Sequence, residues 1–133
     1  MDEVHLRLTD AEHSRVRGMS CEQAALEICR IHLTRSDPNV AFLAPAKGAD
    51  LRFRRQDGVE TDIEVKGTEA GGLAWAKLKV SSQHSHDRLR DGMQLFRVTG
   101  IRAQEVKIFV MKHGVDFKMV VEPRWSVRPA RVK

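Results

Sequence analysis

Residues 60–67 read ETDIEVKG, a segment in which apolar and charged side chains alternate. In an extended strand successive side chains point to opposite faces, so Thr61, Ile63 and Val65 share one face. The other face then carries four charged side chains, Glu60, Asp62, Glu64 and Lys66. The apolar face fits a hydrophobic core, whereas burial does not explain the charged face. The segment is therefore predicted to be a strand that presents a row of charges.

A hairpin is predicted just before this strand. Residues 51–55 (LRFRR) alternate in the same way, and residues 56–58 (QDG) are typical of a turn between two strands. The short apolar run VAFLAP at residues 40–45 lies further upstream. These segments predict strands that lead into the charged one.

The main helix is expected to begin at Ser20, because Ser20 and Gln23 have the spacing of a capping box. The run CEQAALEICRIHL at residues 21–33 follows, and SDPN at 36–39 ends it, since proline disfavours helical geometry in the residue before it. Its apolar stripe at helical spacing consists of Ala24, Ala25, Ile28, Cys29 and Ile31.

The second half of the chain predicts more strands around one short helix. Residues 74–81 (AWAKLKVS) alternate as a strand, and HSHDRLR at 84–90 forms a helix capped by the serines before it. Three segments rich in β-branched and aromatic residues follow: MQLFRV at 93–98, VKIFVM at 106–111 and VDFKMVVE at 115–122. This order predicts a mixed α/β or α+β protein with a mixed central sheet and the main N-terminal helix packed on it.

The chain of 133 residues is expected to form one domain with a core of its own. Residues 1–17 mix charges with few apolar anchors and are interpreted as a loosely packed or partly helical lead-in. Residues 18–122 are expected to form the folded domain. Residues 123–133 are interpreted as a basic tail with little order.

The overall charge raises the expectation of a polyanionic partner. The chain carries a formal net charge of +5, from 23 Lys and Arg against 18 Asp and Glu. No apolar run approaches the roughly 18 residues that span a bilayer, and the first residues lack the pattern of a secretory signal. Cys21 and Cys29 lie too far apart along one helix to form a disulfide. We therefore expect a cytoplasmic protein with reduced thiols and no membrane partner.

The row of charges at 60–66 has two interpretations, a strand face exposed to solvent or the lining of a cleft that binds a cation. Asp62 and Glu64 lie about 7 Å apart along a strand. Their repulsion is roughly 2 kcal/mol at an effective dielectric of about 20, and well under 1 kcal/mol in open water. A solvated face costs little, whereas a cleft requires compensation by Lys66 or a divalent cation. Asp50 precedes a segment that can pair beside this strand, so Asp50 and Glu64 are predicted to meet around one Mg²⁺ or Mn²⁺ ion.

These residues carry a resemblance. The segments GAD at 48–50 and IEVKG at 63–67, separated by the hairpin, resemble the pattern of the PD-(D/E)XK nucleases, with Ala49 in place of the proline. The similarity is greatest to the branch related to Mrr and archaeal Holliday-junction resolvases, and it covers about residues 18 to 112 in element order. It implies a restriction-endonuclease-like αβββαβ core.

The resemblance also implies roles for individual residues. Asp50 and Glu64 would hold the metal, and Lys66 would position water or stabilise charge on the phosphate. Glu22 on the main helix would be a further metal ligand and catalytic carboxylate, with Glu27 as second choice. Gln83 would be an orienting catalytic group. Asp62 is interpreted as a solvated neighbour or as a group that supports the ligands.

Basic residues near this strand are predicted to contact nucleic-acid phosphates. They are Arg52, Arg54, Lys77 and Lys79. The alternative is an ordinary exposed edge, where lysines prevent unwanted strand pairing. The tail arginines, including Arg124, are equally consistent with a solvated terminus and with a DNA-binding arm.

The expected function is metal-dependent endonucleolytic hydrolysis of DNA. Because one domain carries one cleavage centre, cutting both strands favours a homodimer. The alternative is a catalytically inactive nuclease fold that binds nucleic acid or assembles a larger defence or repair complex. A nuclease of the same fold that acts on RNA stays open as a third interpretation.

Overall fold

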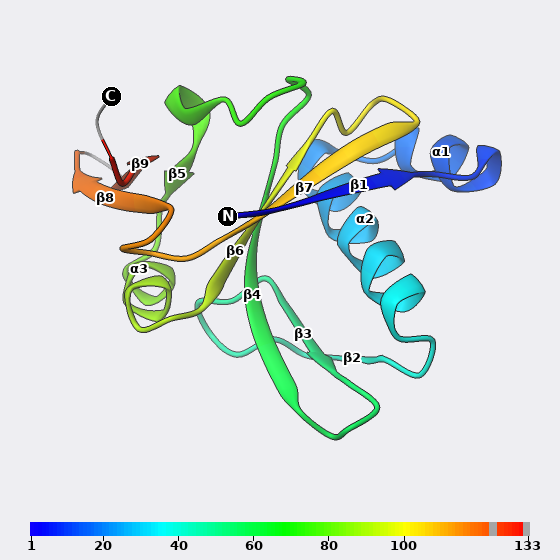
Figure 1. The fold of residues 1–133 in the computed structure, drawn as a ribbon, viewed down its shortest axis with the longest axis horizontal. Helices are drawn as coiled ribbons and strands as arrows, with labels where there is room; N and C mark the ends of the chain where they lie inside the picture. Colours follow the sequence, from blue (N-terminus) through cyan, green and yellow to red (C-terminus); the bar gives the residue numbers. More distant parts are fainter. Residues whose placement is uncertain (123–124, 132–133) are drawn as a thin grey trace.

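The computed structural model describes residues 1–122 and 125–131 as a mixed α+β protein (Figure 1). The helical elements are α1 (Asp10–Arg17), α2 (Cys21–Ser36), the 3₁₀ turn η1 (Trp75–Lys77) and α3 (Gln83–Arg90). The strands are β1 (Asp2–Arg7), β2 (Ala41–Leu43), β3 (Leu51–Arg54), β4 (Glu60–Gly67), β5 (Lys79–Val80), β6 (Gln94–Thr99), β7 (Glu105–Met111), β8 (Phe117–Val121) and β9 (Trp125–Pro129). The prediction of a mixed helix and sheet class is confirmed.

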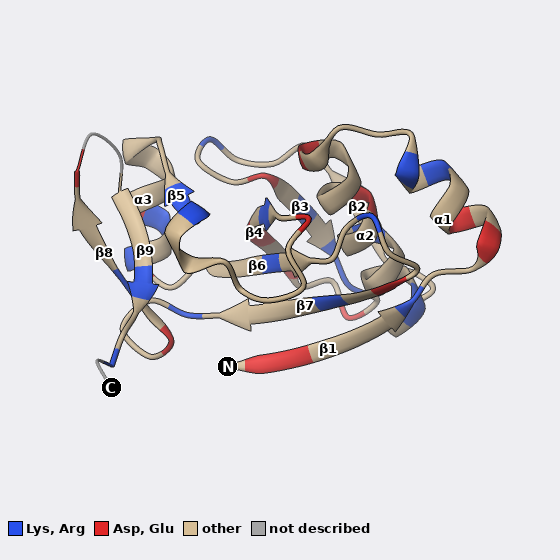
Figure 2. Ribbon diagram, turned by 90° about the horizontal axis from the view of Figure 1, so that it is seen from above, with Lys and Arg blue, Asp and Glu red and all other residues tan. Residues whose placement is uncertain are grey.

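A six-stranded sheet in the order β1-β7-β6-β4-β3-β2 forms the centre of the protein. Strands β4 and β6 pair in parallel, and every other pairing in this sheet is antiparallel. The connection between β4 and β6 passes through η1, β5 and α3. A smaller sheet in the order β5-β9-β8 stands beside it (Figure 2).

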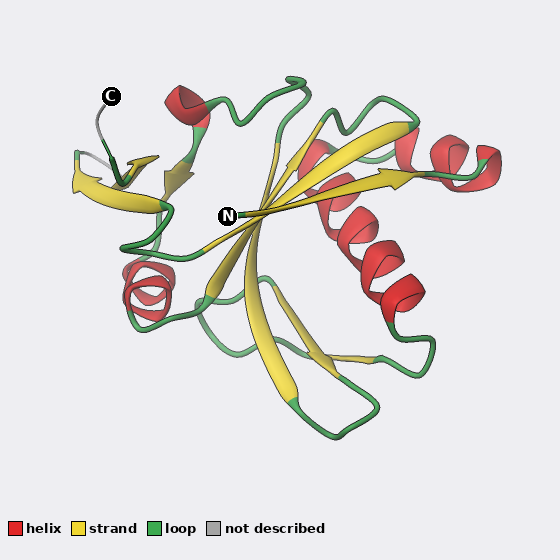
Figure 3. Ribbon diagram, in the orientation of Figure 1, coloured by secondary structure: helices red, strands yellow, loops and turns green. Residues whose placement is uncertain are grey.

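Helix α2 packs on one face of the large sheet (Figure 3). Ser20 caps it by accepting a hydrogen bond from the backbone N–H of Gln23, as the sequence pattern predicts. The apolar side of α2, including Ile28 and Cys29, shares one core with Ile63 and Val65 of β4. The predicted assignment of Ile63 and Val65 to a core face is therefore confirmed.

The opposite face of the large sheet is covered by α3 and the small sheet. A second core there joins Leu89 of α3, Leu95 of β6, Phe117 of β8 and Val127 of β9. The side chains of Asp62, Glu64 and Lys66 belong to this face of β4, because they alternate with Ile63 and Val65. Other elements therefore cover the part of this face that carries Asp62 and Glu64.

The first residues are part of the sheet, so the interpretation of a loosely packed lead-in differs from the structure. Strand β1 pairs with β7, and Leu6 and Leu8 are buried in the same core as α2. Thr9 begins α1 with a full capping box to Glu12. The alternation of Val4, Leu6 and Leu8 was the available sequence signal for this strand. Few apolar positions are enough to hold β1 in the sheet, because it is an edge strand that pairs only with β7 among the described residues.

Two further segments differ from the sequence expectations. Residues 74–81 form a 3₁₀ turn followed by a two-residue strand, because Ala74 adopts a left-handed conformation with φ of 50° that breaks the extension. Leu78 and Val80 are nevertheless buried, as the alternation predicts. In the basic tail, residues 125–129 form β9 and are not loosely ordered, while Arg124 lies outside the described residues.

No helix within residues 1–122 and 125–131 combines the length and the apolar character required to cross a membrane.

Candidate functional site

Asp50, the residue just before β3, lies beside Glu64 of the neighbouring strand β4. Leu51 of β3 pairs with Ile63 of β4, so continuing the register by one residue places Asp50 opposite Glu64. The backbone N–H of Asp50 donates to the carbonyl of Ile63 at 2.9 Å. The Asp50 Oδ2 atom accepts a hydrogen bond from the backbone N–H of Val65 at 2.8 Å. The Asp50 carboxylate is therefore fixed against β4.

Glu64 is buried, with 2% of its surface exposed, and this corrects the expectation that burial does not account for the charged face. Its Oε2 atom lies 3.6 Å from the Nζ atom of Lys66, whereas its Oε1 atom has no hydrogen-bond partner. Burial, the charge of Asp50 and a hydrogen bond with Asp50 raise the pKa of Glu64 to about 8, against a smaller opposing effect of Lys66. The Glu64 carboxyl group therefore retains its proton near neutral pH.

The loop that carries Asp50 is held against α3. Gly48 has a φ of +89°, and a side-chain carbon added there would lie 2.8 Å from the backbone carbon of His84. Only glycine tolerates both the left-handed conformation and this close approach. The first turn of α3 thereby positions the segment that leads to Asp50.

Asp62 belongs to an ion-pair cluster, so the interpretation of a solvated neighbour is wrong. Its side chain is only 6% exposed. Arg52 donates to both of its oxygens, at 3.1 and 2.9 Å, and Arg88 of α3 donates to Oδ2 at 2.7 Å. These bonds join β3, β4 and α3 across the charged face. Asp62 therefore supports the site by fixing α3 over the sheet.

Arg97 of β6 is a buried cation on the same face. It pairs in register with Lys66, and 2% of its surface is exposed. Its guanidinium donates to the carbonyls of Leu73, Gly67 and Ala74 at 2.9, 3.2 and 3.3 Å. Burial lowers its pKa. Arg97 therefore anchors both ends of the loop between β4 and η1, next to Lys66.

The structure does not bring the two other predicted catalytic residues into this group. Glu22 is exposed in the first turn of α2, and Glu27 pairs with Arg15 and Arg30. Gln83 is exposed and donates to Asp87 at 2.7 Å. Within residues 1–122 and 125–131, no set of three or more His, Cys, Asp or Glu side chains is arranged to hold a metal ion. The site of the described chain thus consists of Asp50, Glu64 and Lys66.

The predicted phosphate-binding residues are largely engaged elsewhere. Arg52 binds Asp62, and Arg54 lies 3.9 Å from Glu60. Lys79 donates to Ser126 at 2.6 Å and lies 3.7 Å from Glu122. Lys77 is exposed, with no carboxylate of the described residues within ion-pair distance. Lys77 and the exposed Arg54, whose contact with Glu60 is long, are therefore the members of this set that are available to a phosphate.

The donor chemistry of the pair is compatible with one divalent ion. Mg²⁺ is commonly held by one or two carboxylates, with water and substrate oxygens completing its coordination. Asp50 and Glu64 supply two adjacent carboxyl groups, and the unpartnered Oε1 atom of Glu64 is a buried acceptor without a donor. Asp50 and Glu64 are the residues that would hold the ion.

Arg88 and Arg97 are functional candidates that sequence reasoning missed. The signal for Arg97 was a single cation inside the apolar run MQLFRV, since such a residue is buried only with several acceptors around it. Arg88 had no comparable local signal, because its partner lies on another element.

Comparisons with known protein families, curated proteins and solved structures find no match to this chain.

Proposed function

We propose that this protein is a metal-dependent nuclease that hydrolyses phosphodiester bonds of DNA, with its catalytic centre at Asp50, Glu64 and Lys66. The observation that carries the proposal is the juxtaposition of two carboxyl groups on paired strands with an ammonium group 3.6 Å from one of them. A structural ion pair would need one carboxylate for Lys66. The second carboxylate, placed where it raises the pKa of the first, is better explained by a cation that both would bind.

The order of the elements supports the same proposal. Helix α2, the antiparallel strands β2, β3 and β4, helix α3 and the parallel strand β6 occur in the order of the αβββαβ core that the resemblance implies, with η1 and β5 inserted between β4 and α3. Asp50 just before β3 and the Glu-x-Lys segment of β4 are neighbours in the sheet register, which supports the arrangement that the resemblance implies.

The roles of the chain's own residues follow from their positions. Asp50 and Glu64 would hold the ion, which when bound would supply Lewis-acid stabilisation and a more acidic water. Lys66, about one-third exposed, presents its ammonium group to the phosphate, where it stabilises developing negative charge and orients the attacking water. The Arg52–Asp62–Arg88 cluster keeps α3 and the Asp50 loop in place.

A cleavage assay tests the proposal. Supercoiled, linear, branched and single-stranded DNA, and RNA, are incubated with Mg²⁺ or Mn²⁺. Asp50→Asn, Glu64→Gln and Lys66→Met are each expected to lower the cleavage rate at least about a hundredfold, because each removes a group that acts on the transition state. Glu60→Gln is the matched control, since Glu60 shares the strand face but is exposed and forms only ion pairs of 3.9 Å.

A readout independent of cleavage is the thermal shift caused by Mn²⁺. Asp50→Asn and Glu64→Gln should abolish the shift, whereas Lys66→Met and Glu60→Gln should retain it. Cleavage that survives substitution of Asp50 and Glu64 would contradict the proposal. Preferential cleavage of RNA would replace DNA as the proposed substrate but would not change the proposed catalytic residues.

The alternative is a nucleic-acid-binding or assembly module with this fold and no catalysis. The observation that favours it is the exposed position of Glu22 and Gln83, which leaves the described site with only two carboxylates. DNA binding by the unmodified protein without cleavage at any metal concentration would support the module.

A further inference from the structure

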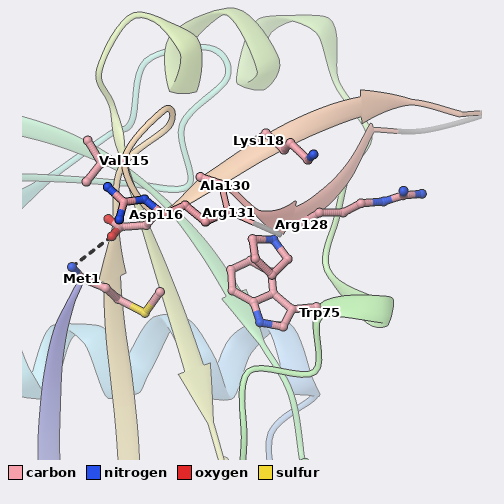
Figure 4. A pocket seen from close by; sticks show the side chains of 9 residues that line it. Met1, Trp75, Val115, Asp116, Lys118, Arg128, Ala130 and Arg131 are labelled. Atoms are coloured by element: carbon pink, nitrogen blue, oxygen red, sulfur yellow. Dashed lines mark ion pairs between the residues drawn. The ribbon is translucent and has the colours of Figure 1, made fainter. Parts of the chain in front are cut away.

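A cavity of about 700 Å³ lies where η1 meets the β8–β9 hairpin (Figure 4). This volume is within the roughly 300–1,000 Å³ of ordinary ligand pockets. Its lining includes the indole of Trp75 and three cations, Lys118, Arg128 and Arg131. Asp50, Glu64 and Lys66 do not line it, so it is separate from the proposed catalytic centre.

The charge of the cavity is unbalanced in favour of an anion. Lys118 of β8 and Arg128 of β9 are directly opposite each other in the strand register, which is unfavourable for like charges. Figure 4 shows both side chains extending in the same direction from the paired strands. Asp116 is neutralised by the amino group of Met1 at 2.9 Å.

Arg128 shares its only carboxylate partner among the described residues with Lys79, a cation outside the cavity. Glu122 pairs with Arg128 and also lies 3.7 Å from Lys79. Lys118 is exposed and has no carboxylate of the described residues within ion-pair distance. Figure 2 shows basic positions of β5 and β9 gathered at the same end of the protein. An anionic group beside Lys118 would supply the counter-charge that Glu122, shared by Arg128 and Lys79, does not provide.

The aromatic wall of the cavity, formed by Trp75, is held in place by contacts within the protein. Trp75 follows Ala74, whose left-handed backbone is held by the hydrogen bond from the Arg97 guanidinium to its carbonyl. The Trp75 side chain is half-buried, since it also packs against the core beneath the small sheet. A rigid, partly exposed indole beside cations is suited to stack on a base whose phosphate the cations bind.

We propose that this cavity binds one nucleotide of an unpaired nucleic-acid strand, with the base against Trp75 and the phosphate between Lys118 and Arg128. The inference rests on the proposed function for the class of substrate, and it narrows that class to nucleic acid with a single-stranded segment. Arg97 connects the two places, because it holds Ala74 and pairs in register with Lys66. Ala74 and Arg97 thus form a chain of contacts between the Trp75 wall of the cavity and the β-strand that carries Lys66.

Binding without cleavage tests the inference. Fluorescence anisotropy of short labelled oligothymidine, oligouridine and duplex DNA is measured with EDTA present, so that no metal-dependent cleavage occurs. Trp75→Leu should weaken single-strand binding about fivefold to a hundredfold, whereas Trp75→Phe should retain most of it. Lys118→Gln should weaken binding and reduce the slope of log Kd against log salt by about 0.7.

The control for charge loss is Arg17→Gln. Arg17 is exposed in the last turn of α1, at the far end of the protein from the small sheet, and it forms no ion pair with described residues (Figure 1). Equal loss of affinity in Arg17→Gln and Lys118→Gln, or unchanged single-strand binding by Trp75→Leu, would overturn the inference.

The two proposals fail separately. Metal-dependent cleavage together with unaltered single-strand binding by Trp75→Leu would reject only the nucleotide cavity. Trp75-dependent binding of oligonucleotides without cleavage would reject only the nuclease. Preference for oligouridine over oligothymidine would identify RNA as the source of the nucleotide.

Discussion

Glu64 is a carboxyl group in surroundings that disfavour its charge. Its pKa is raised from 4.5 to about 8, so the folded protein holds this proton more tightly than the unfolded chain does. The stability gained in this way is complete below about pH 4.5 and is lost as the pH rises through about 8. The free energy of unfolding should therefore fall between these values, by at most about 1.4 kcal/mol per pH unit from this group.

Glu64→Gln should remove this dependence, because the amide stays neutral at every pH. The measurement is urea unfolding at a series of pH values with a chelator present, for the unmodified protein, Glu64→Gln and Glu60→Gln. The same slope in Glu64→Gln as in the unmodified protein would show that another group is responsible.

At this scale the sequence predicts the pair but not its surroundings. The positions of Asp50, Glu64 and Lys66 follow from strand alternation and from the register of one hairpin, which are local properties. The burial of Glu64 and Asp62 depends on α3, which covers the strand from a distant part of the chain, so no local pattern contains it.

Among the elements, the loop before β3 is the one on which the site depends most directly. Gly48→Ala places a left-handed backbone and a clash with His84 at the same position, whereas Gly58→Ala has the same strain, at a φ of +88°, with nothing within 4 Å. Gly58→Ala should cost about 1 kcal/mol of stability, and Gly48→Ala clearly more.

Activity distinguishes the two glycine variants further. Gly48→Ala should lower the cleavage rate, because it moves the Asp50 loop away from α3, while Gly58→Ala should cleave normally. Thermal unfolding and the cleavage assay measure both effects. If both variants lose activity equally, the contact with His84 does not position Asp50.

The elements themselves were predicted with varying success. Helices α2 and α3 each begin after a capping serine, and the β3–β4 hairpin shows a turn sequence between two alternating segments. These are strong local signals. The strand predicted over residues 74–81 was largely wrong because the backbone of Ala74, held by Arg97, overrides the alternation. Such a tertiary contact is not visible in a window of eight residues.

In the molecule as a whole, strand β1 is an integral part of the large sheet and contributes to its core. Leu6 is 6% exposed and packs in the core that α2 shares with β4. Leu6→Asp should lower the free energy of unfolding by about 2–5 kcal/mol, since it buries a charge and empties a core position. His5→Gln, on the exposed side of the same strand, should change it by less than about 0.5 kcal/mol.

Urea unfolding followed by circular dichroism measures this difference. Equal stability of the Leu6→Asp and His5→Gln proteins would mean that β1 does not belong to the cooperative unit. The pairing of β1 with β7 joins segments that are far apart in the sequence, so the sequence predicts the alternation of β1 but not its partner.

The close approach of α2 to Gly67 makes Cys21 a site where modification should disturb the structure. A side-chain carbon at Gly67 would lie 2.7 Å from Ala25 and 3.4 Å from the Cys21 sulfur. Cys21 is partly exposed, whereas Cys29 is fully buried and burial raises its pKa. Iodoacetamide should therefore label Cys21 alone, and the added group should force the helix off the residue that follows Lys66. Mass spectrometry locates the label, and the labelled protein should unfold at a lower temperature, with Cys21→Ala as the insensitive control.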